Sequence, residues 1–196
     1  VGSTTSSIVS LEQSFHRFLE RGSASGQMAT TMFKTMNHSL ALNLASYLRF
    51  QGTVLSPSSA CATGAEAIML GGQFIKSGVC DIAICGGADE LHMSTAIAFD
   101  TAHAASRGFN HVPHTASRPF DTDRDGVVVS EGAALTILES ESSRSARGVS
   151  SHGTLVGWAQ SCDGGSVAHS GVRSMADNMR SALRMAELEP SDIGYR

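Results

Sequence analysis

Apolar residues recur roughly every 3.6 positions in four segments of the chain, which is the spacing of amphipathic helices. The clearest segment is Ser6–Glu20, which has Ser and Thr residues before it and Gly after it as end signals. The same spacing predicts helices over Met36–Phe50, Cys61–Gly78 and Val172–Met185. These four segments are the predicted helices of the chain.

Short apolar runs between polar or glycine-rich stretches predict strands. The expected strands are Thr53–Leu55, Ile82–Cys85, Val127–Val129, Ala133–Leu138 and Leu155–Trp158. The run Ile82–Cys85 carries no polar side chain and is closed by two glycines, which indicates a strand buried on both faces, as in a parallel sheet. The pattern therefore predicts an α/β protein in which residues 53–87 form one strand-helix-strand unit.

Two segments lack a regular apolar pattern. Thr101–Asp125 contains histidines and Asp-rich turns and is predicted to be a long loop, a kind of segment that usually has a function. Ser140–Gly148 is polar and is interpreted as a connection at an internal boundary. The chain stops at Arg196 just after Ile193 begins a new apolar stretch, which indicates truncation.

Small side chains dominate the composition, since Ser (29), Ala (24) and Gly (20) make up 73 of the 196 residues. Such residues let backbones approach closely, and Gly64 and Gly87 are expected where a helix and a strand pass each other. The net charge of -4 argues against nucleic acid or a membrane surface as a partner. No apolar run reaches the roughly 18 residues of a membrane helix. Because the sequence starts without a secretory leader, the protein is expected to be cytoplasmic.

The four cysteines form no CxxC pair, so neither a zinc ribbon nor a redox dithiol is indicated. Cys61 follows a predicted strand and a turn of small residues and opens a predicted helix. At that place free backbone N–H groups and the helix dipole favour a thiolate, and the N–H of Cys61 itself can help to hold an oxyanion. A small buried side chain is the alternative role for Cys61. Cys85 ends an apolar strand and is expected to have a packing role.

Two polar segments have partial metal-site patterns. Asp121–Gly126 matches the start of a calcium loop, but the twelfth position is Gly instead of Glu and the following residues predict a strand. A turn whose carboxylates accept backbone N–H groups and pair with Arg118 or Arg124 is the expected structure. His111 and His114 have no Cys or carboxylate at a completing distance and are interpreted as surface residues. No bound metal is expected.

Four blocks of residues occur in the order and spacing of a known family. They are Ser59-Ala60-Cys61-Ala62-Thr63-Gly64, Ile84-Cys85-Gly86-Gly87-Ala88-Asp89-Glu90, Ala116-Ser117-Arg118-Pro119-Phe120-Asp121 with Arg124-Asp125-Gly126, and Glu131-Gly132-Ala133. With these blocks the chain resembles the β-ketoacyl-[acyl-carrier-protein] synthases, condensing enzymes of the thiolase superfamily, over nearly its whole length. The block around Cys61 is more similar to the fatty-acid type than to modular polyketide ketosynthases.

The resemblance implies a thiolase-like fold with α-β-α-β-α layers, present here in part. Residues 1–148 would form most of the N-terminal half with the nucleophile, and residues 149–196 would begin the C-terminal half. The implied reaction starts with transfer of an acyl group from the phosphopantetheine of acyl carrier protein to Cys61. A decarboxylative Claisen condensation with malonyl-acyl carrier protein follows, in fatty acid biosynthesis. The resemblance implies a homodimer and no cofactor beyond the carrier-bound phosphopantetheine.

The resemblance also suggests roles for four other residues. Phe99 matches an aromatic residue beside the acyl pocket, and Met36 and Asn37 match residues that reach across the dimer into the partner's pocket. Arg107 matches a basic residue that meets the acidic carrier protein. The family's two catalytic histidines and its lysine belong beyond the end of this chain. The fragment alone is therefore expected to be inactive, and its full-length parent active.

Three alternatives remain open at this stage. The parent can be a type II polyketide or polyunsaturated fatty acid ketosynthase, or a hydrolytic or transfer relative that acylates the cysteine without condensing. From a different class, it can be a non-catalytic partner subunit that shapes the pocket of a heterodimer. Such subunits commonly lack the nucleophile, so the presence of Cys61 counts against this third alternative.

Overall fold

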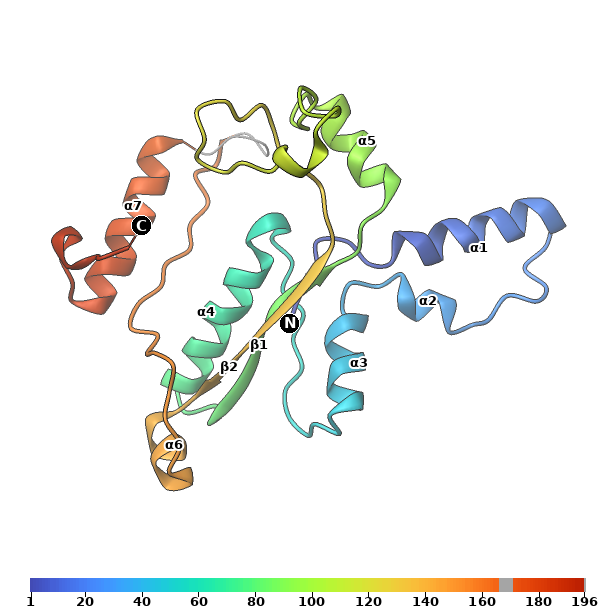
Figure 1. The fold of residues 1–196 in the computed structure, drawn as a ribbon. Coiled ribbons are helices and arrows are strands. Elements are labelled where there is room, and N and C mark those ends of the chain that lie inside the picture. Colours follow the sequence, from blue (N-terminus) through green and yellow to red (C-terminus); the bar gives the residue numbers. More distant parts are fainter. Residues whose placement is uncertain (166–170, 196) are drawn as a thin grey trace. The chain divides into compact units, whose positions relative to one another are not determined.

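The computed structural model describes residues 1–165 and 171–195 of the chain (Figure 1). Residues 166–170 and Arg196 belong to the expected second half, and they lie outside the described residues. The backbone groups into two compact units, which are discontinuous in sequence. The first unit consists of Val1–Gly64 and Gly86–Leu135, and the second consists of Ala65–Cys85 and Thr136–Arg196.

The first unit contains the helices α1 (Ile8–Arg21), α2 (Thr31–Lys34), α3 (Ser39–Tyr47) and α5 (Met93–Thr101). The predicted first helix is confirmed by α1, because both of its ends carry the expected signals. Ser7 accepts a hydrogen bond from the Ser10 N–H at the amino end. Gly22 ends the helix in the left-handed conformation, with φ of 61°.

Helix α3 is shorter than the predicted Met36–Phe50, so Met36 and Asn37 precede it. After its last turn the backbone turns at Arg49, which has a φ of 52°. No helix is predicted from the sequence where α2 and α5 form. The apolar side chains of α5 are spread around the helix instead of lying on one stripe, so it carries no helical periodicity.

Helix α4 (Thr63–Lys76) begins in the first unit and continues in the second, which also contains α6 (Glu141–Arg147) and α7 (Val172–Ala186). The predictions for α4 and α7 are confirmed. The prediction of a connection over Ser140–Gly148 is wrong, because this segment forms α6. Ser140 caps its amino end, Gly148 ends it with a φ of 67°, and Arg144 pairs with Glu141 along it. Caps and a charge pair, without an apolar stripe, form this helix.

Two strands, β1 (Ile82–Asp89) and β2 (Gly132–Glu139), form the sheet (Figure 1). The Ser140 N–H donates to the Asp81 carbonyl (2.8 Å) at one end of this pair, and the Leu91 N–H donates to the Glu131 side chain (3.2 Å) at the other. The strands β1 and β2 are therefore antiparallel. The parallel pairing expected for residues 82–85 is wrong where β1 pairs with β2. At the other edge of β1, Gly2 forms a single parallel bridge with Gly87.

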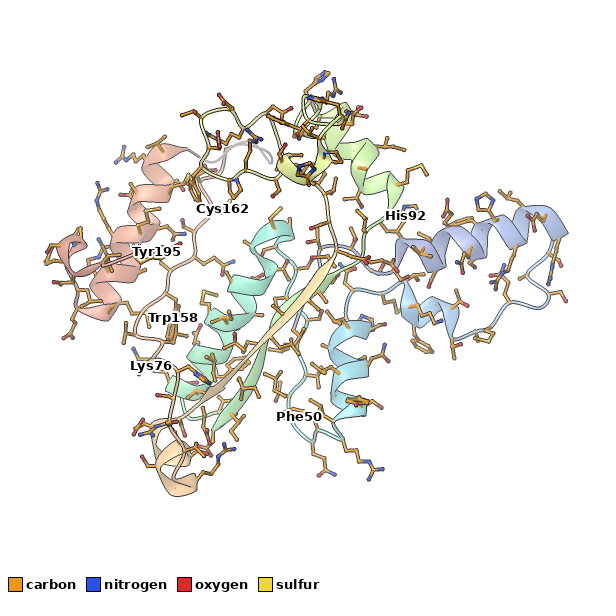
Figure 2. All side chains as sticks on the ribbon, viewed as in Figure 1. Phe50, Lys76, His92, Trp158, Cys162 and Tyr195 are labelled. Atoms are coloured by element: carbon orange, nitrogen blue, oxygen red, sulfur yellow. The ribbon has the colours of Figure 1, made fainter. Side chains whose placement is uncertain are left out.

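Three predicted strands are wrong. Residues 53–55 and 155–158 form no strand, and residues 127–129 contribute only an isolated parallel bridge between Val127 and Ala105. An apolar run shows that a segment is suited to burial, but a strand forms only where a neighbour supplies its hydrogen bonds. The Leu155 and Trp158 side chains pack on α4 instead, at Gly72, and Lys76 lies over the Trp158 ring, 5.9 Å from its centre (Figure 2).

Glycines allow the close contacts that the composition predicts. Gly64 and Gly87 approach each other as expected, since a Cβ on Gly87 would lie 3.7 Å from the Gly64 Cα. The tighter contact lies in the second unit, where Gly71 of α4 faces β1 and a Cβ on it would overlap the Cys85 Sγ. Cys85 is 3% exposed, which confirms its packing role.

None of the helices formed by the described residues combines the length and the apolar character needed to cross a membrane.

Candidate active site

Cys61 lies in an exposed turn at the amino end of a long helix. The 3₁₀ turn Ala60–Ala62 leads directly into α4, so Cys61 precedes the helix instead of lying in its first turn. Its side chain is exposed. The alternative role of Cys61 as a small buried side chain is therefore wrong. The thiol can be reached by a reagent or substrate beside the positive end of a helix of 14 residues.

The backbone of this turn is unusual directly before Cys61. Ala60 has a φ of 50°, a left-handed conformation that residues with a Cβ seldom adopt. The Thr63 hydroxyl accepts a hydrogen bond from the Ser59 N–H (2.9 Å) and donates one to the Ala60 carbonyl (2.6 Å). The Ser59 hydroxyl is buried and has no hydrogen-bond partner among the described residues. Strained backbone of this kind is concentrated at functional sites.

Met36 and Asn37 line a cavity of about 540 Å³ within the first unit. Its wall also carries the carboxylates of Asp89, Glu90 and Glu131. Asp89 accepts hydrogen bonds from the Thr4 N–H (2.7 Å) and from neighbouring hydroxyls of the N-terminal segment, and Glu90 accepts from Ser7 and the Val9 N–H. These carboxylates thus hold the N-terminal segment against the end of β1. Cys61, Phe99 and Arg107 are not among the residues that line this cavity.

Phe99 and Arg107 belong to one local structure at the end of α5. Phe99 is half-buried, and its carbonyl accepts hydrogen bonds from the N–H groups of Ala104 and Ala105. The Arg107 guanidinium, 53% exposed, donates from Nε to the Asp100 carboxylate (2.7 Å) and from Nη2 to the Asp100 carbonyl (2.8 Å). Arg107 is therefore held by the residue that follows Phe99.

Asp125 fixes the loop that carries Arg107. Its carboxylate accepts hydrogen bonds from the Ser106 hydroxyl (2.6 Å) and from the N–H groups of Arg107 (2.8 Å) and Gly108 (2.6 Å). The Ser106 hydroxyl, followed by the two backbone N–H groups, lowers the pKa of Asp125 to about 2. One exposed carboxylate thus determines the course of three consecutive residues.

The other Asp residues of this segment make the expected turn. The Asp121 carboxylate accepts the Asp123 N–H, while Arg124 donates to the Asp121 carbonyl instead of to a carboxylate. The turn with backbone contacts is confirmed. Among the described residues neither arginine pairs with a carboxylate, since Arg118 donates to the Thr115 carbonyl and Arg124 to that of Asp121. In residues 1–165 and 171–195 no group of three or more His, Cys, Asp or Glu side chains is arranged to hold a metal ion.

All five residues singled out from the sequence lie in the first unit, but they fall into three local sites: Cys61 in its turn, Met36 and Asn37 at the cavity, and Phe99 with Arg107. The residues that hold these sites were not identified from the sequence. They include Thr63 and Asp100. The only sequence signal for Thr63 is that Thr near the start of a helix commonly caps it.

Comparisons with known proteins match most of the chain to one family. Residues 1–144 match the family model of the β-ketoacyl synthase N-terminal domain. Over 141 residues the chain is 38% identical to the 3-oxoacyl-[acyl-carrier-protein] synthase 1 of Haemophilus influenzae, an alignment that covers 72% of this chain and 34% of the relative. The chain thus spans about a third of the length of the curated relatives that it matches.

Solved structures share the fold. A β-ketoacyl synthase from Burkholderia phymatum STM815 matches with a TM-score of 0.91 and 35% identity, covering 99% of this chain and 47% of that chain. The ishigamide ketosynthase/chain length factor matches with a TM-score of 0.83 and 29% identity, over 97% of this chain and 46% of that chain. These likenesses confirm the expected thiolase-like α/β fold, present here in part. The chain belongs to the β-ketoacyl synthase family.

Proposed function

We propose that Cys61 is the acyl-accepting nucleophile of a β-ketoacyl-[acyl-carrier-protein] synthase of fatty acid biosynthesis. The observation that supports this proposal best is the exposed Cys61 thiol in a strained turn at the amino end of α4. Thiolates attack thioesters readily and form thioesters that are themselves easily attacked, so a cysteine suits a reaction with two acyl transfers.

In the first step the Cys61 thiolate attacks the thioester carbonyl of an acyl group carried on phosphopantetheine. The new S–C bond forms at Cys61 while the C–S bond to phosphopantetheine breaks, and the released thiolate takes up a proton. In the second step malonyl-acyl carrier protein loses CO₂, and the electron pair left on its α-carbon attacks the Cys61 thioester. The Cys61 thiolate leaves and is ready for the next acyl group. The Cys61 N–H is suited to bind the oxyanion formed in both attacks.

Acyl carrier protein is the proposed partner, and its phosphopantetheine brings the substrates. Arg107 is suited to meet an acidic carrier because its guanidinium is about half exposed and held by Asp100. Phe99 lies next to Asp100 in α5, so the proposed acyl-pocket aromatic and the proposed carrier contact are adjacent. We further propose that the complete protein is a homodimer in which Met36 and Asn37 reach the partner's pocket. The cytoplasmic location and the division into halves 1–148 and 149–196 stay predictions from the sequence.

The test is to incubate the full-length protein that contains this chain with acyl carrier protein loaded with acetyl or octanoyl groups, and to locate the acyl group by peptide mass spectrometry. We expect acylation at Cys61. The same preparation with malonyl-acyl carrier protein should form a 3-oxoacyl product, whereas the 196-residue chain alone should form none. Acylation of Cys80 or Cys162 with Cys61 unmodified would overturn the assignment.

A type II polyketide synthase is the second candidate, and the observation that favours it is 29% identity over 159 residues to the oxytetracycline polyketide putative beta-ketoacyl synthase 1 of Streptomyces rimosus. In such a system the protein would elongate one chain repeatedly with little release of short products. Product length in the same assay separates the two candidates. A non-catalytic partner subunit is less consistent with the chain, because the exposed Cys61 is present.

A further inference from the structure

Thr63 controls the peptide group that joins Ala60 to Cys61. Its hydroxyl donates to the Ala60 carbonyl (2.6 Å) and accepts from the Ser59 N–H (2.9 Å), so a single oxygen holds the turn from both sides of Ala60. The Ala60 carbonyl and the Cys61 N–H belong to the same planar peptide and point in opposite directions. Fixing the direction of this carbonyl therefore fixes the direction of the Cys61 N–H.

This turn requires such a contact to keep its shape. Ala60 adopts a left-handed backbone with a φ of 50°, which a residue with a Cβ leaves readily unless its surroundings prevent it. The neighbouring Ser59 hydroxyl is buried without a hydrogen-bond partner among the described residues, so it provides no alternative contact there. Two backbone hydrogen bonds also support the turn, from the Thr63 N–H to the Ala60 carbonyl and from the Ala62 N–H to the Ser59 carbonyl (3.1 Å). Among the side chains of the described residues, the Thr63 hydroxyl is the group that adds to them at Ala60.

The surroundings of Thr63 separate the role of its hydroxyl from that of its methyl group. Thr63 is 3% exposed, and its methyl group lies against Gly2, where a Cβ would overlap it. Valine has the shape of threonine without the hydroxyl, and serine keeps the hydroxyl without the methyl group. Thr63→Val and Thr63→Ser therefore test the hydrogen bonds and the packing one at a time.

We infer that Thr63 is a positioning residue of this site, whose hydroxyl aims the Cys61 N–H at the oxyanion that forms when Cys61 attacks a carrier-bound thioester. This inference rests on the proposed function. Thr63 does not touch the substrate, and it acts through the Ala60–Cys61 peptide. Losing an aimed backbone donor slows acyl-transfer chemistry by about 10²-fold or more, while substrate binding changes little.

The experiment measures acylation of Cys61 in single turnovers by the full-length protein, with acetyl-acyl carrier protein as the probe. In Thr63→Val we expect the maximal acylation rate to fall by about 10²-fold, with a half-saturating carrier concentration within about threefold of wild type. In Thr63→Ser most of the rate should return. Alkylation of Cys61 by iodoacetamide needs no oxyanion donor, so in both variants its rate should stay within about threefold of wild type.

Thr115→Val is the matched control, because the Thr115 hydroxyl also donates to the carbonyl three residues before it, that of Val112 (2.9 Å). It should acylate Cys61 at the wild-type rate. A wild-type acylation rate in Thr63→Val would overturn the inference. So would an equal loss in the Val and Ser variants, because packing would then explain it. If Thr63→Val does not fold, the acylation rate of folded Thr63→Ser decides. A rate far below wild type overturns the inference, and a rate close to wild type supports it. If wild-type Cys61 is never acylated, the proposed function itself fails.

Discussion

Cys61 and Cys85 are the same kind of residue in opposite surroundings. Cys61 is exposed in a short turn that is held by hydrogen bonds of the Thr63 side chain and of the backbone. Cys85 is 3% exposed in β1 and lies against Gly71 of α4. Burial raises the pKa of the Cys85 thiol, which disfavours its reactive thiolate. The difference shows that one residue type serves two structural roles here: the Cys61 thiol is accessible to solvent, whereas the Cys85 thiol fills space between α4 and β1.

The largest expected effect separates the two cysteines by activity. Cys61→Ser should reduce the proposed condensation by the full-length protein by about 10³-fold or more, because the proposed acyl intermediate can no longer form on sulfur. Cys85→Ala should lower the free energy of unfolding by about 1 kcal/mol and leave turnover within about threefold. Steady-state kinetics and urea denaturation measure both effects. A Cys85 variant as inactive as the Cys61 variant would remove the distinction between them.

The second prediction tests the packing around Cys85. Gly71→Ala should destabilise the protein by roughly 1–3 kcal/mol, because the added methyl group overlaps the Cys85 sulfur. Gly64→Ala is the matched control in the same helix, since its Cβ would come no closer than 3.9 Å to the Gly87 nitrogen. Urea denaturation should show a lower midpoint for the Gly71 variant alone. Equal midpoints for the two variants would contradict close packing at Cys85.

The third prediction concerns the left-handed residue beside Cys61. Ala60→Val should cost about 1–2 kcal/mol of stability, because a β-branched residue is strained at a φ of 50° although the position is exposed. Ala60→Gly should not share this loss, since glycine adopts this conformation freely. Ala65→Val, at an exposed position of α4, controls for the smaller helical penalty of valine, about 0.5 kcal/mol. If thermal unfolding shows the same loss of stability in Ala60→Val as in Ala65→Val, the turn is not strained.

The smallest expected effect is a pH dependence of stability that comes from Asp125. Like Thr63 in the turn at Cys61, Asp125 holds backbone groups through polar contacts. Because the folded pKa of Asp125, about 2, is below its usual 3.8, its contribution to stability is present above about pH 4 and is lost as the pH falls toward 2. Asp125→Asn should therefore weaken the decrease in stability between these values, and Asp123→Asn, exposed in the same loop, should not. Urea midpoints measured from pH 6 to pH 2 test this. Parallel curves for wild type and Asp125→Asn would contradict it.

A helix with both end signals and an apolar stripe could be predicted from the sequence, as α1 shows, and for α7 the apolar stripe alone was sufficient. The strands at residues 53–55 and 155–158 could not, because an apolar run does not reveal whether it will pair in a sheet or pack on a helix, as Trp158 does. Helix α6 could not be predicted from an apolar pattern either, because its caps and its Glu141–Arg144 pair form it without apolar periodicity.

For the candidate site, the sequence indicates which residues are candidates for chemistry but not which residues hold them in place. Cys61 is recognisable in the sequence as a cysteine between small residues just before a predicted helical pattern. Thr63 and Asp125 act through backbone groups of residues close in space, and nothing in the pattern showed which carbonyl or N–H each would meet. The same limit applied to glycines: Gly64 and Gly87 were singled out, whereas the tighter contact of Gly71 depended on tertiary packing.

The contact between Gly71 and Cys85 also bears on oxidative damage. Oxidation of a cysteine to a sulfenic or sulfinic acid adds oxygen atoms to its sulfur, and the space beside the Cys85 sulfur is occupied by the backbone of α4. Peroxide is therefore expected to act first on the exposed thiols of Cys61 and Cys162. Under oxidative stress such a protein would lose its proposed acyl acceptor while the packing around Cys85 stays intact. Oxidation would therefore reduce the proposed acyl transfer before it reduces the stability of the fold.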